Sequence, residues 1–235
     1  MLDGKNTKLY DIFYSGVIMQ QQNMKKEPTV FIIDDDEAVR DSLKMLMRSV
    51  DQTVEAFSSP SEFLEVYDEN RPGCIVLDIR MPGMSGIELQ SRLNGMHCLL
   101  PIIFITGHGD VPMAVQAIKN GAMNFIQKPF RDQELLDLVT DALKLDTQQR
   151  KELLEHKEIL RRLSTLTDRE REVLHRVVEG KANKVIAADI NLSQRTIEIH
   201  RSRVMEKMGT KSLAHLVRQI MQVKEHFGGG FNSKI

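Results

Sequence analysis

Short apolar runs recur along the chain from Thr29 to about residue 126, and turn-forming or charged residues bound each run. Runs of this length and composition are typical of strands that are buried on both faces of a sheet. We therefore predict strands at residues 30–33, 53–56, 74–77, 102–105 and 124–126.

Longer amphipathic stretches separate these runs. In residues 38–49, Val39, Leu43 and Met47 fall on one face of a helix. We predict helices at residues 38–49, 61–67, 86–93, 111–120 and from Asp132 onward. Strands that alternate with helices predict a parallel sheet covered on both faces, with the ligand site at the carboxyl ends of the strands.

A charged segment follows this alternation. Residues 144–163 contain no Gly or Pro and are rich in helix formers, so we predict that they continue the helix that begins at Asp132. Leu153, Leu160 and Leu163 could form a seam, but it is too short to predict a coiled coil.

After Thr165 the pattern is helical only. A capping box at Thr167 and Glu170 begins the first helix, which ends at Gly180. The following helices are predicted at residues 183–189, at 194–208 after a Ser193 cap, and at 212–223. A short helix, a turn and a longer helix fit a helix-turn-helix.

The net charge of −1 conceals a difference between the two halves. Residues 24–146 carry 12 Lys or Arg against 20 Asp or Glu, whereas residues 164–235 carry 13 against 8. This asymmetry suggests two domains with different partners. The partner of the basic second domain would be a polyanion. Charge alone would also fit a solvated surface.

Several classes of protein are disfavoured by composition. Two cysteines, Cys74 and Cys98, cannot form a disulfide framework or a zinc site. No apolar run approaches the length of a membrane-spanning helix, and the first residues lack the pattern of a secretory signal. We therefore expect a cytoplasmic protein with no membrane partner.

Polar side chains stand at the ends of four predicted strands. Asp34 and Asp35 follow the first strand, Asp78 the third, Thr106 the fourth and Lys128 the fifth. Grouped carboxylates repel one another unless a cation holds them, and oxygen ligands suit Mg²⁺. Such a site can transfer a phosphoryl group to a carboxylate, while a hydroxyl and an ammonium group hold the phosphoryl oxygens. Each Asp singly would fit a loop, and Lys128 a plain ion pair, so the ordered set carries the prediction.

The segments VFIIDDDEAVR, IVLDIRMPGMSG, FITGHGDVPMAV and NFIQKPF resemble receiver domains of two-component response regulators, most closely the FixJ type. The resemblance implies an α/β receiver with a five-stranded parallel sheet of the flavodoxin/CheY-like kind. It implies that Asp78 accepts a phosphoryl group, assisted by Thr106 and Lys128. It also implies Mg²⁺ (or Mn²⁺) held by Asp34, Asp35, Asp78 and the Arg80 backbone carbonyl.

The same resemblance implies a switch made by Thr106 and Phe125, and a cis peptide before Pro129. The switch aromatic is often Tyr in this fold; Phe125 has no hydroxyl, so burial alone would drive its movement. Asp36 matches no role in the resemblance and is interpreted as a loop charge.

Residues from Leu166 to about Val217 resemble the LuxR-type helix-turn-helix of NarL/FixJ regulators. The polar start of the longer helix fits an element that enters the major groove. By resemblance, Glu198, Ile199 and Ser202 read bases, and a Glu at a position where many relatives carry Lys implies a different base preference. The candidate phosphate contacts are Lys184, Arg195, Thr196, His200, Arg201, Arg203 and Lys207.

The predicted organisation has five parts. They are a disordered or non-native extension (residues 1–26), a receiver (27–145), a helical linker (146–163), an all-α four-helix LuxR-type DNA-binding domain (164–227) and a flexible tail (228–235).

We predict a transcription regulator, an activator by resemblance, that a sensor histidine kinase controls by phosphorylating Asp78. Phosphorylation would drive formation of a homodimer that binds two half-sites of promoter DNA in the major groove and contacts RNA polymerase. Its enzymatic activity would be limited to self-phosphorylation and slow self-dephosphorylation. Two alternatives are a phosphohydrolase, which turnover of a phosphate ester would favour, and a protein-binding module, which failure to bind DNA would favour.

Overall fold

The computed structural model describes residues 27–107 and 111–227, so the expectations for residues 1–26 and 228–235 lie outside the described residues. The chain divides into two compact units, one that ends at Arg150 and one that begins at Lys151.

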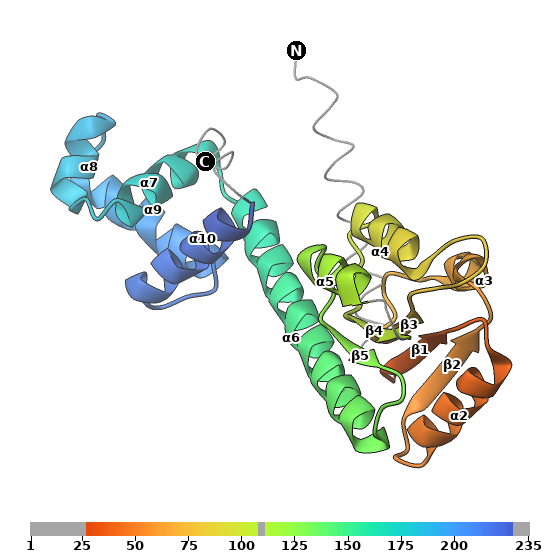
Figure 1. Ribbon diagram of the computed structural model, residues 1–235. Helices are drawn as coiled ribbons and strands as arrows, with labels where there is room; N and C mark the ends of the chain where they lie inside the picture. The colour runs from red at the N-terminus through yellow and green to blue at the C-terminus, as the bar shows by residue number, and fades with distance from the viewer. Residues whose placement is uncertain (1–26, 108–110, 228–235) are drawn as a thin grey trace. The chain divides into compact units, whose positions relative to one another are not determined.

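The first unit contains a five-stranded parallel sheet (Figure 1), as the sequence predicted. Its strands are β1 (Thr29–Ile33), β2 (Thr53–Phe57), β3 (Gly73–Asp78), β4 (Ile102–Thr106) and β5 (Asn124–Gln127). They lie side by side in the order β2-β1-β3-β4-β5, with every neighbouring pair parallel. The three inner strands β1, β3 and β4 are completely buried, which explains their continuous apolar sequences.

Helices cover both faces of this sheet. Side chains of a strand alternate between the faces, so Val30 and Ile32 join one core cluster while Phe31 and Ile33 join the other. The helices that pack with Phe31 are α3 (Pro60–Val66), α4 (Gly86–Gly95) and α5 (Val111–Lys119). Those that pack with Val30 are α2 (Glu37–Arg48) and the first turns of α6 (Asp132–Ser164).

A buried ion pair fixes α6 to the sheet beyond its apolar turns. The Asp146 carboxylate accepts hydrogen bonds from the Gly73 amide (3.0 Å) and from Nε of Arg150 (2.9 Å to each oxygen). The Arg150 guanidinium also donates to the carbonyls of Glu69 (3.0 Å) and Arg71 (2.7 Å). These contacts join the helix to the loop before β3.

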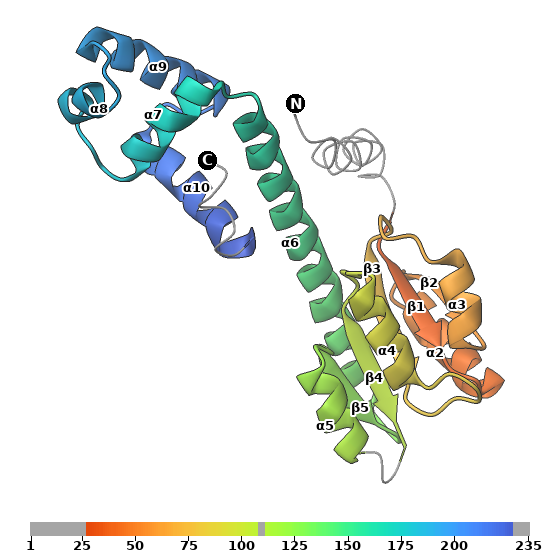
Figure 2. The ribbon, with the colours of Figure 1, turned by 90° about the horizontal axis from the view of Figure 1, so that it is seen from above.

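The second unit is helical throughout its described residues. Its helices after α6 are α7 (Asp168–Val178), α8 (Asn183–Asp189), α9 (Gln194–Lys207) and α10 (Leu213–Phe227) (Figure 2). Each of these four helices supplies buried residues to a shared core, among them Val173, Ile186, Ile197 and Leu216. Ile159 and Leu163 from the last turns of α6 belong to the same core, so these turns are more than the charged connector that the sequence predicted.

Helix caps account for several residues that the sequence singled out. Thr167 and Glu170 form both hydrogen bonds of a capping box, and Ser193 caps α9. Asp36 is the N-cap of α2, because its Oδ1 accepts from the amides of Ala38 (2.9 Å) and Val39 (3.4 Å). The interpretation of Asp36 as a plain loop charge was therefore wrong.

Within residues 27–107 and 111–227, no helix is both long enough and apolar enough to cross a membrane.

Candidate functional site

Four polar side chains gather at one edge of the sheet because parallel strands end on the same side. Asp34 follows β1, Asp78 is the last residue of β3, Thr106 is the last residue of β4, and Lys128 follows β5. The first three are buried, with exposed fractions of 2%, 9% and 0% respectively. Burial of two carboxylates at one edge requires a positive partner nearby.

Lys128 supplies that partner. Its Nζ donates to Oδ2 of Asp34 (2.9 Å) and to Oδ1 of Asp78 (3.0 Å), so two carboxylates share one ammonium group and a net negative charge remains. The Lys128 amide donates to the Thr106 carbonyl (2.8 Å), and the Lys128–Pro129 peptide is cis, as the resemblance implied. Burial opposes the charge on Lys128, but the hydrogen bonds that its ammonium group donates to both carboxylates outweigh burial and raise the pKa of the ammonium group.

Opposing electrostatic effects act on the pKa of the Asp78 carboxyl. Burial raises its pKa above the ordinary value and the charge of Asp34 adds to this, whereas Lys128 and the Arg80 amide oppose it. The Arg80 amide donates to Oδ2 at 2.7 Å. Asp78 therefore carries fixed donors on both oxygens, yet it gains from any further cation placed beside it.

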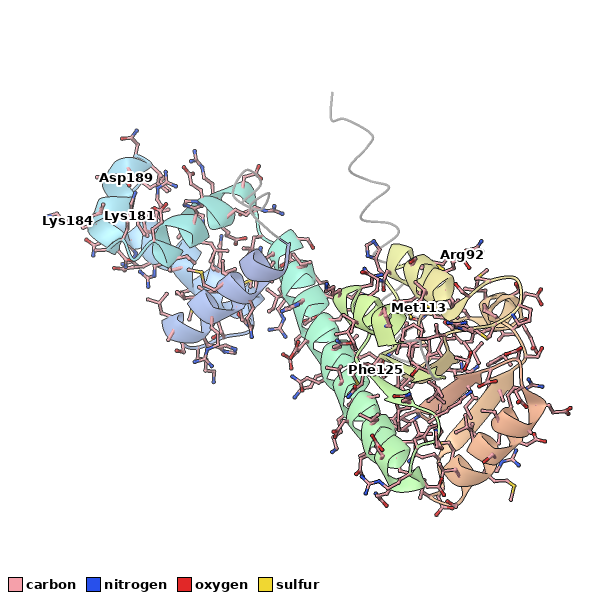
Figure 3. The ribbon with its side chains drawn as sticks, viewed as in Figure 1. Arg92, Met113, Phe125, Lys181, Lys184 and Asp189 are labelled. Carbon is pink, nitrogen blue, oxygen red and sulfur yellow. The ribbon has the colours of Figure 1, made fainter. Side chains whose placement is uncertain are left out.

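Thr106 has an unused hydrogen-bonding group. Its hydroxyl is buried and finds no hydrogen-bond partner within the described part of the chain. An orphaned buried hydroxyl is uncommon and indicates a missing partner. Phe125 on β5 is half-buried and packs against the same core cluster as Met113 of α5 (Figure 3).

Oxygen donors dominate this edge, but not all the predicted metal ligands converge. The Asp35 side chain is exposed, and its carbonyl, like that of Asp34, is held by the Arg40 guanidinium (2.9 and 2.7 Å). Among the described residues no three His, Cys, Asp or Glu side chains are grouped closely enough to hold a metal ion. Two converging carboxylates still fit Mg²⁺, which keeps several waters and takes few protein ligands.

This arrangement suits attack on a phosphoryl group. A carboxylate at a strand end can act as a nucleophile, an ammonium group beside it can neutralise the incoming oxygens, and a hydroxyl without a partner can bind one of them. Sequence reasoning missed Arg40, whose contacts shape the loop after β1; a lone Arg on a helix face carries no signal for that role.

The second unit presents a separate polar face on α9. Arg195, Glu198, Ile199, Ser202 and Arg203 are all exposed, and the spacing of the first four places them on one side of the helix. Ile199 is 46% exposed, which leaves its apolar surface available for contact. Lys184 on α8 is also exposed (Figure 3).

The remaining predicted contacts lie differently. Thr196 is half-buried, and its hydroxyl and amide both bond to the Ser193 hydroxyl. Nη1 of Arg201 donates to Oδ1 of Asn183 (2.7 Å), and Nδ1 of His200 is buried without a partner in the described chain. Lys207 binds Glu170 (2.6 Å) and the Thr165 carbonyl (3.0 Å), so its ammonium group is engaged inside the domain.

Two family models match the chain. Residues 30–140 match the response regulator receiver domain, and residues 164–220 match the bacterial regulatory proteins of the luxR family. The match covers both the acidic edge of the sheet and the exposed face of α9.

Similar proteins span nearly the whole chain. Response regulator protein TmoT of Ectopseudomonas mendocina is 41% identical over 90% of this chain and 96% of its own length. Transcriptional regulatory protein FixJ of Rhizobium meliloti is 44% identical over 86% of this chain and 97% of its own. The solved structure of response regulator StyR has a TM-score of 0.75 at 43% identity, and covers 83% of this chain and 99% of its own. The chain therefore belongs to the NarL/FixJ family of two-component response regulators, with a receiver domain and a LuxR-type DNA-binding domain.

Proposed function

We propose that a sensor histidine kinase phosphorylates Asp78 and that this modification controls binding of the LuxR-type domain to promoter DNA. The observation that carries the proposal is the position of the Asp78 carboxylate. It ends the central strand between the Lys128 ammonium group and the Arg80 amide, at the same edge as a buried Thr106 hydroxyl that has no partner.

The residues divide the chemistry between them. A bond forms from an Asp78 carboxylate oxygen to phosphorus, and the bond from phosphorus to the histidine nitrogen of the kinase breaks. Lys128 exchanges its contact with Asp78 for one with a phosphoryl oxygen, because the new group carries more negative charge than the carboxylate. Asp34, Asp78 and the Arg80 carbonyl would hold Mg²⁺ or Mn²⁺, and the exposed Asp35 side chain would have to turn inward to join them. The ion would supply further charge neutralisation. Besides this self-phosphorylation and slow self-dephosphorylation, we propose no enzymatic activity.

Thr106 and Phe125 form the switch. The Thr106 hydroxyl gains its missing partner by bonding to a phosphoryl oxygen, and the space that it leaves allows the half-buried Phe125 ring to turn inward. Phe125 has no hydroxyl, so the free energy of the inward state comes from burial of the ring alone.

The output is a homodimer in the cytoplasm that binds two half-sites, because a single helix-turn-helix reads only one. Glu198, Ile199 and Ser202 read bases. The phosphate contacts are Lys184, Arg195, Arg203 and the less exposed Thr196, His200 and Arg201. Lys207 is better explained as a contact within the domain. RNA polymerase is the expected partner of the bound activator.

Intact mass spectrometry tests this function. Acetyl phosphate and Mg²⁺ should add one phosphoryl group to the full chain and none to Asp78→Asn. Asp36→Asn is the matched control, since Asn also caps a helix and the loop loses the same charge. Equal labelling of Asp78→Asn and the parent protein would exclude Asp78 as the acceptor.

A further inference from the structure

The last turns of α6 contact the C-terminal end of α9 through Arg162. Nη1 of Arg162 donates to the Met208 carbonyl at 2.8 Å. Met208 is the C-cap residue of α9, so its carbonyl lies at the negative end of the helix dipole, where a cation is favourable. Arg162 is only half-buried, but its partner on α9 is a backbone carbonyl, whose position the helix fixes.

The end of α9 is shaped to receive this guanidinium. Gly209 adopts φ +64°, and the amide of the next residue, Thr210, donates back to the Met205 carbonyl at 3.0 Å. The Met208 carbonyl is therefore left to accept from Arg162. A Cβ at Gly209 would lie 2.2 Å from Nη1 of Arg162. The left-handed backbone favours glycine here, and an added Cβ would force the flexible end of the Arg162 side chain to move.

Glu158 holds the other side of the guanidinium. Its Oε1 accepts from Nε of Arg162 at 2.7 Å, and ion pairs with Arg161 and then with Arg162 lower the pKa of Glu158 to about 2. Arg162 therefore bridges a carboxylate on its own helix and a carbonyl on α9, which needs the two separate donors of a guanidinium.

A second contact joins the same two segments. Lys207, the last residue of α9, donates to the Thr165 carbonyl just after α6 and to Glu170, whose side chain is 3% exposed. Both contacts lie at the C-terminal end of α9, at the opposite end of that helix from Arg195 and Glu198.

We propose that Arg162 and Lys207 are positioning residues that set the angle of α9, so that the end of α6 controls how the DNA-reading face meets a base pair. The proposal rests on the DNA-binding role of α9. A 14-residue helix is about 21 Å long, so a tilt of roughly 5° at one end moves the other by about 2 Å. Direct hydrogen bonds to bases do not survive a displacement of that size.

The test compares Arg162→Gln with Arg161→Gln in the full chain. Arg161 is the matched control, because it is the neighbouring arginine and also pairs with Glu158. For duplexes that the parent protein selects from a random pool, we expect Arg162→Gln to bind about 10-fold more weakly than the control. This is the effect of losing one charge-assisted hydrogen bond. Affinity for random-sequence DNA should be equal in the two variants. If Arg162 only stabilised the fold, Arg162→Gln would lower the melting temperature. At temperatures below the melting temperature, the ratio of affinity for selected duplexes to affinity for random-sequence DNA would then equal that of the control.

Gly209→Ala gives a second test that keeps Arg162 and its charge. The added Cβ displaces the guanidinium, so the ratio of selected to random affinity should fall as in Arg162→Gln. An unchanged ratio in Arg162→Gln or in a folded Gly209→Ala would overturn the proposal. Arg195→Ala distinguishes failure of the positioning role from failure of the DNA-binding role of α9. If Arg195→Ala, like Arg162→Gln, binds DNA as the parent protein does, the DNA-binding role of α9 fails. If only Arg195→Ala loses DNA affinity, the positioning role alone is rejected.

Discussion

Replacing Arg150 with Met should strongly destabilise the receiver unit. The guanidinium makes four hydrogen bonds, two to Asp146 and one each to the carbonyls of Glu69 and Arg71. The Asp146 side chain is 1% exposed and the Arg150 side chain 19% exposed. Burial already raises the pKa of Asp146, and Arg150 is the main group that opposes this.

The magnitude follows from what the substitution leaves behind. Removing one partner of a buried ion pair costs about 3–5 kcal/mol, because the other charge stays buried without compensation. Partial exposure of Arg150 lets water reach the two carbonyls, so we expect about 3 kcal/mol. For a unit of this size, that corresponds to a fall in melting temperature of roughly 10 °C.

Scanning calorimetry of the full chain measures this loss in the receiver transition. Lys151→Met is the matched control, since it removes a neighbouring positive charge at an exposed position and should leave the transition within about 1 °C. The double variant Asp146→Asn with Arg150→Met should recover part of the loss, because no charge remains buried and the Asn side-chain oxygen can still accept from the Gly73 amide. A fall of less than about 2 °C in Arg150→Met would refute the reasoning.

Three further predictions concern the site, the DNA and assembly. Because the pKa of Asp78 is raised in the folded protein, the stability that protonated Asp78 contributes is full below about pH 4 and is lost as the pH rises. Calorimetry should therefore give Asp78→Asn a higher melting temperature than the parent protein at pH 7, and a smaller difference between the two near pH 4. Glu198→Ala should relax preference at one base pair by roughly 1–3 kcal/mol in a selection on randomised duplexes, whereas Lys184→Ala should weaken all sequences alike; the reverse result would contradict this division. Light scattering should show a doubled molar mass after phosphorylation, and an unchanged mass with unchanged DNA affinity would reject dimerisation.

Much of the fold could be predicted from the sequence because local patterns specify it. Each inner strand is buried on both faces and therefore reads as an apolar run that stops at a polar residue. Parallel connections then place Asp34, Asp78 and Thr106 at one edge whatever the details of packing. Capping patterns gave the starts of α7 and α9 in the same way.

Pairwise contacts between distant residues could not be predicted. Lys207 reads as a free cation on a basic helix, and its partner Glu170 lies 37 residues earlier, where the sequence shows only its capping role. Asp146 and Arg150 read as an ordinary i, i+4 surface pair, because nothing local reveals that Gly73 approaches Asp146 from 73 residues away. Asp36 differs, because an Asp directly before an amphipathic helix is a cap signal that the sequence itself contains.

Phosphorylation of Asp78 as the control of DNA binding is tested most directly by one titration. Fluorescence anisotropy would measure affinity for a duplex selected from a random pool, with Mg²⁺ and with or without acetyl phosphate, for the parent protein and for Asp78→Asn. We expect acetyl phosphate to raise affinity about 10-fold or more in the parent protein and to have no effect on Asp78→Asn. An equal rise in both proteins, or no rise in a parent protein that carries the phosphoryl group, would contradict the account.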